Sequence, residues 1–183
     1  MSGAASTLPR WSAAVTRLFE IDRVALRAVR DREHRHVTRF MQALTQAGNT
    51  TPWLIHAALL AATASVAPVG IGRMATAGVL ATLVAAVLKR TIRRPRPRHL
   101  EPGLGGALAD PDAFSFPSGH SAVAFAVASA AVSAAPAIAP LELALASGIA
   151  FSRIYLGAHY PLDVLVGIAI GIASALVTGH FLG

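Results

Sequence analysis

Three polar clusters, in a fixed order, hold the residue types in this chain that could do chemistry. They supply cations, a hydroxyl, two imidazoles and a carboxylate, and they read Lys89 to Arg96-Pro97, then Pro117-Ser118-Gly119-His120, then Ser152-Arg153 with His159 and Asp163. A phosphate ester needs its negative oxygens neutralised, a nucleophile in line with the leaving group, and an acid to protonate the leaving oxygen. The three clusters contain a candidate for each part.

One group of candidates would hold the phosphate. Lys89, Arg96 and Arg153 are the predicted cations, and the two guanidinium groups suit paired phosphate oxygens. Ser118 is a predicted helix N-cap, and the backbone N–H groups that follow it, beginning with that of Gly119, are free to bind an anion. We therefore expect these five residues to bind phosphate.

A second group would carry out the reaction. His159 and Asp163 are four residues apart, about one helical turn. The carboxylate can therefore hold one ring nitrogen and present the other as a nucleophile. His120 is then left to act as general acid. The expected course is a phosphohistidine on His159, hydrolysed by a water that His120 activates, and it requires no metal or other cofactor.

The elements that must position these clusters are apolar helices. Hydrophobic residues make up 54% of the 183, the mean hydropathy is +0.56, and only 14% of residues are charged. A span needs about 17–25 residues, and fewer where flanking cations snorkel to the interface. The sequence predicts an all-α fold, a polytopic transmembrane helical bundle with spans at 52–70, 73–90, 119–137, 141–157 and 162–181.

The order of these spans places all three clusters on one face of the membrane. An even number of crossings separates each cluster from the next, so the chain returns to the same side each time. The spans are rich in Ala, Gly, Ser and Thr, which let helices approach closely in lipid. The clusters can therefore converge on a single site.

An arginine-rich arm precedes the spans. We predict an N-terminal arm over residues 1–49 and a transmembrane domain over 50–183. Within the arm, apolar residues fall near helical spacing over 12–47, with arginines between them, which predicts one amphipathic helix. Such a helix is too charged to span a membrane and suits its surface. A solvated helix packed on the core is the alternative.

The basic balance of the chain indicates anionic partners. The net charge is +7, and the arginines border apolar spans, so lipid headgroups and a phosphorylated lipid explain the charge better than nucleic acid does. Arg90, Arg93, Arg94 and Arg98 are accordingly expected to contact headgroups or anchor the helix end. The chain contains no cysteine, which excludes disulfides and thiolate catalysis.

The ordered clusters closely resemble the signature of the type 2 phosphatidic acid phosphatase superfamily of integral membrane lipid phosphatases. Its pattern is Lys, six residues, Arg-Pro; then Pro-Ser-Gly-His; then Ser-Arg, five residues, His, three residues, Asp. Every specified position is matched, by Lys89, Arg96, Pro97, Pro117, Ser118, Gly119, His120, Ser152, Arg153, His159 and Asp163.

This resemblance covers roughly residues 50–182. It implies metal-independent dephosphorylation of lipid phosphates or diphosphates, with His120 as acid and His159 as nucleophile, and structural positions for Pro97, Pro117 and Ser152. One feature departs from the family. Many bacterial members resemble a six-span arrangement, whereas five spans are predicted here, and the arginine-rich helix stands where a first span would be.

The expected location is a cell membrane, crossed several times. Of the 16 Lys and Arg residues, only Arg73 is expected on the face opposite the clusters. The positive-inside rule then favours a cytoplasmic site. The resemblance favours the other side, because bacterial relatives with this signature commonly work on the outer face.

The sequence therefore predicts a lipid phosphatase and leaves its substrate open. The candidates are phosphatidic acid, phosphatidylglycerol phosphate, a polyprenyl phosphate or diphosphate, and a phosphorylated polyprenyl sugar. One alternative is a phosphotransferase that moves a phosphoryl or lipid-linked group to an acceptor alcohol. Another, from a different class, is a non-catalytic lipid-binding membrane protein.

Overall fold

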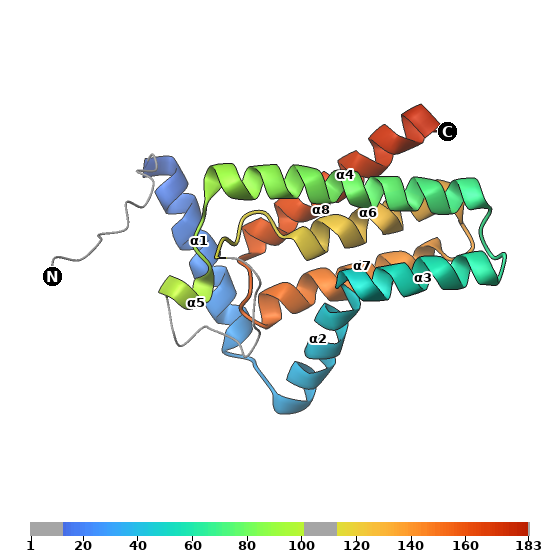
Figure 1. The fold of residues 1–183 in the computed structure, drawn as a ribbon. Coiled ribbons are helices and arrows are strands. Elements are labelled where there is room, and N and C mark those ends of the chain that lie inside the picture. Colours follow the sequence, from blue (N-terminus) through green and yellow to red (C-terminus); the bar gives the residue numbers. More distant parts are fainter. Residues whose placement is uncertain (1–12, 101–112, 183) are drawn as a thin grey trace, which may run out of the picture.

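The computed structural model describes residues 13–100 and 113–182, and the regular elements in these ranges are helices (Figure 1). Within the described residues, one isolated β-bridge joins Pro95 to Phe114. The helices are α1 (Ala13–Arg30), α2 (Arg35–Ala47), α3 (Thr50–Ala62), α4 (Pro68–Ile92), α5 (Pro97–Leu100), α6 (Gly119–Ala134), α7 (Ala139–Tyr155) and α8 (Pro161–Leu182).

Helix α6 is the centre of the bundle, packed against α4, α7 and α8 (Figure 1). Its buried positions are almost all alanine; Ala122, Ala126 and Ala130 belong to the same apolar core as Ala77 and Ala81 of α4. Small side chains let helix backbones approach closely, which is the main source of packing between helices in lipid. The bundle is therefore held by close backbone contact.

The closest of these approaches is between α6 and α8. A Cβ atom at Gly171 would lie 2.5 Å from the carbonyl oxygen of Ala122 and 2.7 Å from the backbone nitrogen of Ala126. One turn earlier, a Cβ at Gly167 would lie 2.5 Å from the carbonyl oxygen of Ser118. These two glycines, four residues apart, set the distance of α8 from the start of α6.

Helices cover most of four predicted spans, whereas the first, 52–70, is wrong in its bounds: α3 ends at Ala62 and α4 already begins at Pro68. Helices α4, with 25 residues, and α8, with 22, are long and apolar enough to cross a membrane, whereas α3 and α6 are apolar but shorter. Helix α7 has 17 residues and buries Glu142 and Arg153. The helical character of the bundle is confirmed, and the number of spans stays a prediction.

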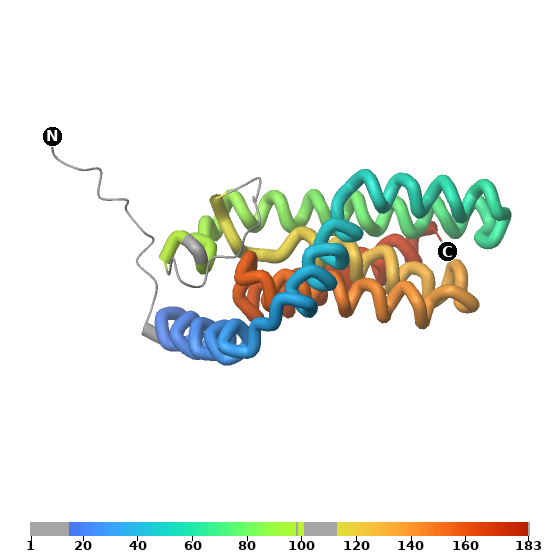
Figure 2. Tube along the Cα trace, turned by 90° about the horizontal axis from the view of Figure 1, so that it is seen from below, coloured from blue at the N-terminus to red at the C-terminus, as the bar shows by residue number. Residues whose placement is uncertain are grey.

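The single helix predicted over 12–47 is wrong, because the chain breaks at 31–34 into α1 and α2. The break allows the two helices to pack in different directions: α2 lies along α7, and α1 lies at the end of the bundle (Figure 2). Tyr155 holds the break, since its hydroxyl accepts the His34 N–H at 2.8 Å and its carbonyl accepts Arg30 Nη1 at 2.9 Å. Residues 1–12 of the predicted arm lie outside the described residues.

We predict that Gly171→Val destabilises the protein, because the backbone of α6 cannot yield to the added side chain. Overpacking of this kind costs about 1–3 kcal/mol. The matched control is Gly179→Val on the same helix, where an added Cβ would meet nothing within 4 Å. Thermal unfolding in detergent should show a lower midpoint for Gly171→Val only. Equal midpoints for both variants would contradict the close α6–α8 contact.

Candidate active site

The three clusters meet in one pocket of about 610 Å³ at the end of the bundle. Each comes from a different element: the C-terminal end of α4, the N-terminal end of α6, and the end of α7 with the loop that leads into α8. The polar residues that line the pocket are Asn49, Thr50, Thr82, Lys89, Arg90, Arg96, His120, Arg153 and His159, and Gly119 lies beside them. The structure thus brings the predicted cations and both histidines together.

His159 lies at the base of this pocket and is 1% exposed. Its Nε2 atom is 3.3 Å from Arg96 Nη1, which also donates to the carbonyl oxygen of Ala158 at 3.0 Å. Its Nδ1 atom is 3.6 Å from Asp163 Oδ2, longer than a hydrogen bond. Catalytic hydrogen bonds are often long before substrate binds and tighten in the complex. The imidazole therefore has its Nδ1 toward the carboxylate and its Nε2 toward the cation.

Asp163 is completely buried in the first turn of α8. Its Oδ2 accepts the backbone N–H of Tyr160 at 2.9 Å, and its Oδ1 accepts Arg94 Nη1 at 2.6 Å. Its carbonyl oxygen accepts the backbone N–H of Ser118 at 2.9 Å. The residue therefore joins the start of α8 both to the His159 loop and to the start of α6.

Ser118 does cap α6, as predicted, but its hydroxyl faces the helix. It is fully buried, and its Oγ lies 2.9 Å from Ser121 Oγ and accepts the Ser121 N–H at 3.4 Å. The pocket wall at this point is formed by Gly119 and His120. Any phosphate contact at this helix end would therefore come from backbone N–H groups rather than from the serine side chain.

The predicted structural positions are buried around the site. Pro97 begins α5, Pro117 precedes the cap of α6, and both are among the most buried side chains. The Ser152 hydroxyl donates to the carbonyl oxygen of Ile149 at 2.6 Å. None of the three lines the pocket wall.

His120 has a partner that the sequence did not reveal. Its Nε2 is 3.0 Å from Asn49 Oδ1, while the amide Nδ2 of Asn49 donates to Gln46 Oε1 at 2.6 Å. Because the amide nitrogen is committed to Gln46, the oxygen faces the imidazole and must accept a proton from it. With the amide in this orientation, Nε2 of His120 carries a proton that it donates to Asn49 Oδ1.

Arg153 is positioned by the N-terminal arm. It is buried, and its Nη1 donates to Thr45 Oγ1 of α2 at 2.6 Å. Thr45 itself is buried on α2, the helix that packs along α7. The arm therefore contributes contacts to the second and third clusters, through Asn49 and Thr45.

Arg94 is the main residue that sequence reasoning misplaced. We expected a headgroup contact or a charge that anchors the helix end, but the side chain is 3% exposed and its Nη1 lies 2.7 Å from Asp22 Oδ2 and 2.6 Å from Asp163 Oδ1. Its guanidinium carbon is 4.0 Å from the centroids of both the Phe19 and the Tyr160 rings. One cation thus connects α1 to the carboxylate beside His159.

Asp22 completes this connection. Its Oδ1 accepts the backbone N–H of Leu162 at 2.8 Å, at the start of α8. Burial raises the pKa of Asp22, while the hydrogen bonds from Leu162 and Arg94 act in the opposite direction. The sequence did hold a signal, because Phe19, Asp22 and Leu26 share one helix face. A carboxylate on the apolar face of an amphipathic helix indicates a buried cationic partner.

Comparison with known proteins identifies the family of the chain. The PAP2 superfamily matches residues 70–183, which include all three clusters. The chain belongs to the PAP2 superfamily. The resemblance drawn from the clusters is thereby confirmed.

Several proteins similar to this chain are lipid phosphatases by name. The chain is similar to the decaprenylphosphoryl-5-phosphoribose phosphatase of Mycobacterium tuberculosis, with 40% identity over 92 residues that make up 50% of each protein. It is similar to the lipid A 1-phosphatase of Rhizobium etli, with 36% identity over 111 residues, 56% of this chain and 46% of the relative. The chain thus spans about half the length of these relatives.

Two solved PAP2 structures share the fold. The transmembrane phosphatidylglycerolphosphate phosphatase of Bacillus subtilis aligns with a TM-score of 0.72 at 23% identity, over 93% of this chain and 87% of that one. The LpxE protein of Aquifex aeolicus aligns with a TM-score of 0.69 at 25% identity, over 85% and 93%. The likeness therefore extends beyond the matched clusters, to most of the chain.

We predict that Arg94→Met strongly destabilises this PAP2 protein, because it leaves Asp22 and Asp163 buried without their shared cation. Removing one partner of a buried ion pair costs about 3–5 kcal/mol. Arg90→Met, an exposed position near the end of α4, four residues before Arg94, is the control and should shift stability by no more than about 0.5 kcal/mol. The midpoint of thermal unfolding in detergent measures both. A stable Arg94→Met protein would show that the bridge is dispensable.

Proposed function

We propose that this PAP2 protein is a lipid phosphatase that acts through a phosphohistidine on His159. The observation that carries the proposal is the placement of His159, with Asp163 at 3.6 Å from its Nδ1 and Arg96 at 3.3 Å from its Nε2. Because the carboxylate is on the Nδ1 side, Nε2 is the nitrogen left to attack. The phosphatase names of the relatives support the same activity.

In the first step, the phosphate of the lipid binds to the cations of the pocket, Lys89, Arg96 and Arg153. Arg96 then exchanges its contact with His159 for a phosphate oxygen, which frees the Nε2 lone pair. A bond forms from Nε2 to phosphorus and the phosphorus–oxygen bond to the leaving group breaks. His120, which enters this step protonated on both ring nitrogens, gives one proton to the leaving oxygen and becomes neutral. Asp163 stabilises the positive charge that develops on the imidazole.

In the second step, water replaces the lipid. Neutral His120 takes a proton from the water as its oxygen bonds to phosphorus, and the bond from phosphorus to Nε2 of His159 breaks. Inorganic phosphate leaves, and both histidines return to their starting states. Each protonated group is restored, so the cycle balances without a metal or another cofactor.

We predict that His159→Gln abolishes phosphate release while the protein still folds. The assay uses purified protein in detergent with EDTA, and the substrates are phosphatidic acid, phosphatidylglycerol phosphate, and polyprenyl mono- and diphosphates. Asp163→Asn should lower turnover by at least about 10³-fold, because the imidazolium loses its counter-charge. His36→Gln, exposed on α2, is the matched control and should retain full activity.

Three results would contradict this proposal. Turnover that survives in His159→Gln would exclude the covalent route. A loss of activity in EDTA that a divalent ion reverses would show that the reaction needs a metal. Phosphate transfer to an added alcohol, in place of release, would favour the phosphotransferase alternative.

We further propose that the protein crosses the cell membrane several times with the pocket on the cytoplasmic side. The basic residues support this side, since Lys89, Arg90, Arg96 and Arg153 lie at the pocket end, whereas Arg73 is in the first turns of α4 at the opposite end. Cytoplasmic segments of membrane proteins carry an excess of Lys and Arg.

Single cysteines test this orientation, because the chain has none of its own. His99→Cys lies at the pocket end and Ser65→Cys at the other, and both positions are exposed. We predict that a membrane-impermeant maleimide labels Ser65→Cys in intact cells, and His99→Cys only after permeabilisation. The reverse pattern would place the pocket outside the cytoplasm.

A further inference from the structure

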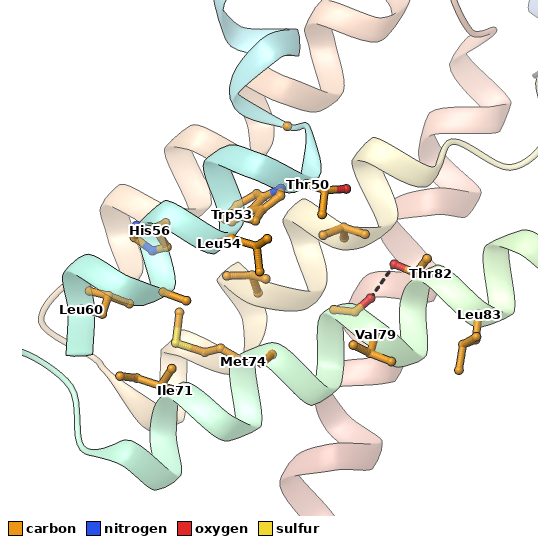
Figure 3. A pocket seen from close by; sticks show the side chains of 16 residues that line it. Thr50, Trp53, Leu54, His56, Leu60, Ile71, Met74, Val79, Thr82 and Leu83 are labelled. Atoms are coloured by element: carbon orange, nitrogen blue, oxygen red, sulfur yellow. Dashed lines mark hydrogen bonds between the residues drawn. The ribbon is translucent and has the colours of Figure 1, made fainter. Parts of the chain in front are cut away.

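The junction between α2 and α3 forms one wall of the pocket that holds His159. Its residues Gly48, Asn49 and Thr50 all line this pocket. Figure 3 shows Thr50 at the start of α3, where it also lines an adjoining apolar pocket of about 320 Å³. The junction belongs to none of the three clusters, yet Gly48 and Asn49 both lie against the imidazole of His120. It is therefore placed to act on the second cluster.

The side chain of Asn49 is turned away from the helix that it begins. Asn49 is the N-cap residue of α3, a position where asparagine usually accepts a backbone N–H of the following turn. Within the part of the chain that the structure describes, its side chain makes no such bond to α3. Its Oδ1 lies 3.0 Å from His120 Nε2 instead, and its Nδ2 donates to Gln46 Oε1 at 2.6 Å. The amide is therefore used for His120 rather than for the helix cap.

Gly48 is also explained by its neighbours rather than by the end of α2. It is the C-cap residue of that helix, but its φ of −79° is open to any residue, so the backbone does not require glycine. The space around it does. A Cβ atom at this position would lie 2.8 Å from His120 Cδ2 and 2.8 Å from Ile149 Cγ2. Two consecutive residues of the junction are therefore fitted to the same imidazole ring.

Both residues approach the same edge of that ring. Asn49 accepts a proton from Nε2, and Gly48 makes room for Cδ2, the carbon bonded to Nε2. In a five-membered imidazole the atom opposite this edge is Nδ1. Which ring nitrogen of a neutral histidine carries the proton is set by the hydrogen bond that the ring makes. The junction therefore favours the form of His120 with its proton on Nε2 and its lone pair on Nδ1.

We propose that Asn49 is a positioning residue for His120, whose amide oxygen holds the Nε2 proton so that Nδ1 exchanges protons with the substrate. The proposal rests on the proposed function, in which His120 is first an acid and then a base. In the first step Nδ1 gives its proton to the leaving oxygen as the bond from phosphorus to that oxygen breaks. In the second step the Nδ1 lone pair takes a proton from the water that attacks phosphorus. Nε2 stays protonated throughout.

Two substrates that differ in their leaving group test this role. One is the best monophosphate lipid of the panel above, whose leaving alkoxide needs a proton. The other is the soluble para-nitrophenyl phosphate, whose leaving anion is stable without one. Asn49→Leu removes the acceptor, Asn49→Asp keeps an acceptor oxygen, and Thr51→Leu, exposed in the first turn of α3, is the matched control. Asn49 is itself exposed, so its substitution leaves no cavity in the core.

The two kinetic parameters report different steps. For Asn49→Leu we expect kcat/KM to fall at least about 10²-fold on the lipid and less than about 3-fold on the soluble ester, because only the first needs an acid. This parameter includes no step after the leaving group departs. In contrast, kcat should fall on both substrates, since the same phosphohistidine must be hydrolysed. Asn49→Asp should stay within about 10-fold of the wild type on the lipid, and Thr51→Leu should match the wild type.

A spectroscopic measurement reads the proton on His120 without turnover. Nitrogen NMR of protein with isotope-labelled histidine shows which ring nitrogen of a neutral imidazole is protonated, and loss of a signal in His120→Gln identifies that of His120. We expect the Nε2-protonated form in the wild type and in Thr51→Leu. Asn49→Leu should show a mixture of the two forms, because the acceptor that selects one of them is gone.

Four results would overturn the proposal. They are an equal loss of kcat/KM on both substrates in Asn49→Leu, an unchanged kcat/KM on the lipid in that variant, a loss in Asn49→Asp as large as in Asn49→Leu, and the same protonated nitrogen of His120 with and without Asn49. A wild type that releases phosphate from neither substrate would instead contradict the proposed function. The NMR spectra would then still decide the role of Asn49.

Discussion

The burial of one cation, Arg94, is the constraint on which the site depends. A charge in an apolar interior is costly unless it is paired and hydrogen-bonded, and here the pairing uses carboxylates from both ends of the chain. Asp22 comes from α1 and Asp163 from α8, and two aromatic rings cover the guanidinium faces. The same carboxylates also bind the backbone N–H groups of Tyr160 and Leu162. The loop that carries His159 is therefore held from both sides.

The site also requires α8 to lie close to α6, and small residues allow this close approach. Gly167 and Gly171 bring α8 against α6, and the N–H of Ser118 binds the carbonyl oxygen of Asp163 at that contact. Larger residues at these positions would separate the second cluster from the third. The alanine-rich composition of the spans is thus a condition for the pocket as well as for packing in lipid.

The sequence was sufficient to predict the parts of the site that follow local rules. The four-residue spacing of His159 and Asp163 and the helix cap at Ser118 are properties of short segments. The even number of predicted crossings between the clusters follows from the order of the helices. The partners Asp22, Thr45 and Asn49 were missed because each comes from the arm, whose packing depends on the break at 31–34. With one continuous helix assumed over 12–47, Asp22 and Thr45 fall about 140° apart around the helix axis, so no register could place both against the bundle.

The central claim is that His159 carries the phosphoryl group between lipid and water. It is tested most directly by rapid quenching of the purified protein with a lipid labelled in its phosphate, followed by mapping of the labelled peptide. The account predicts an acid-labile, base-stable phosphoryl group on His159, absent from His159→Gln, that forms and decays at rates compatible with turnover. Turnover without any labelled protein, or label on Ser118 or His120 instead, would contradict it.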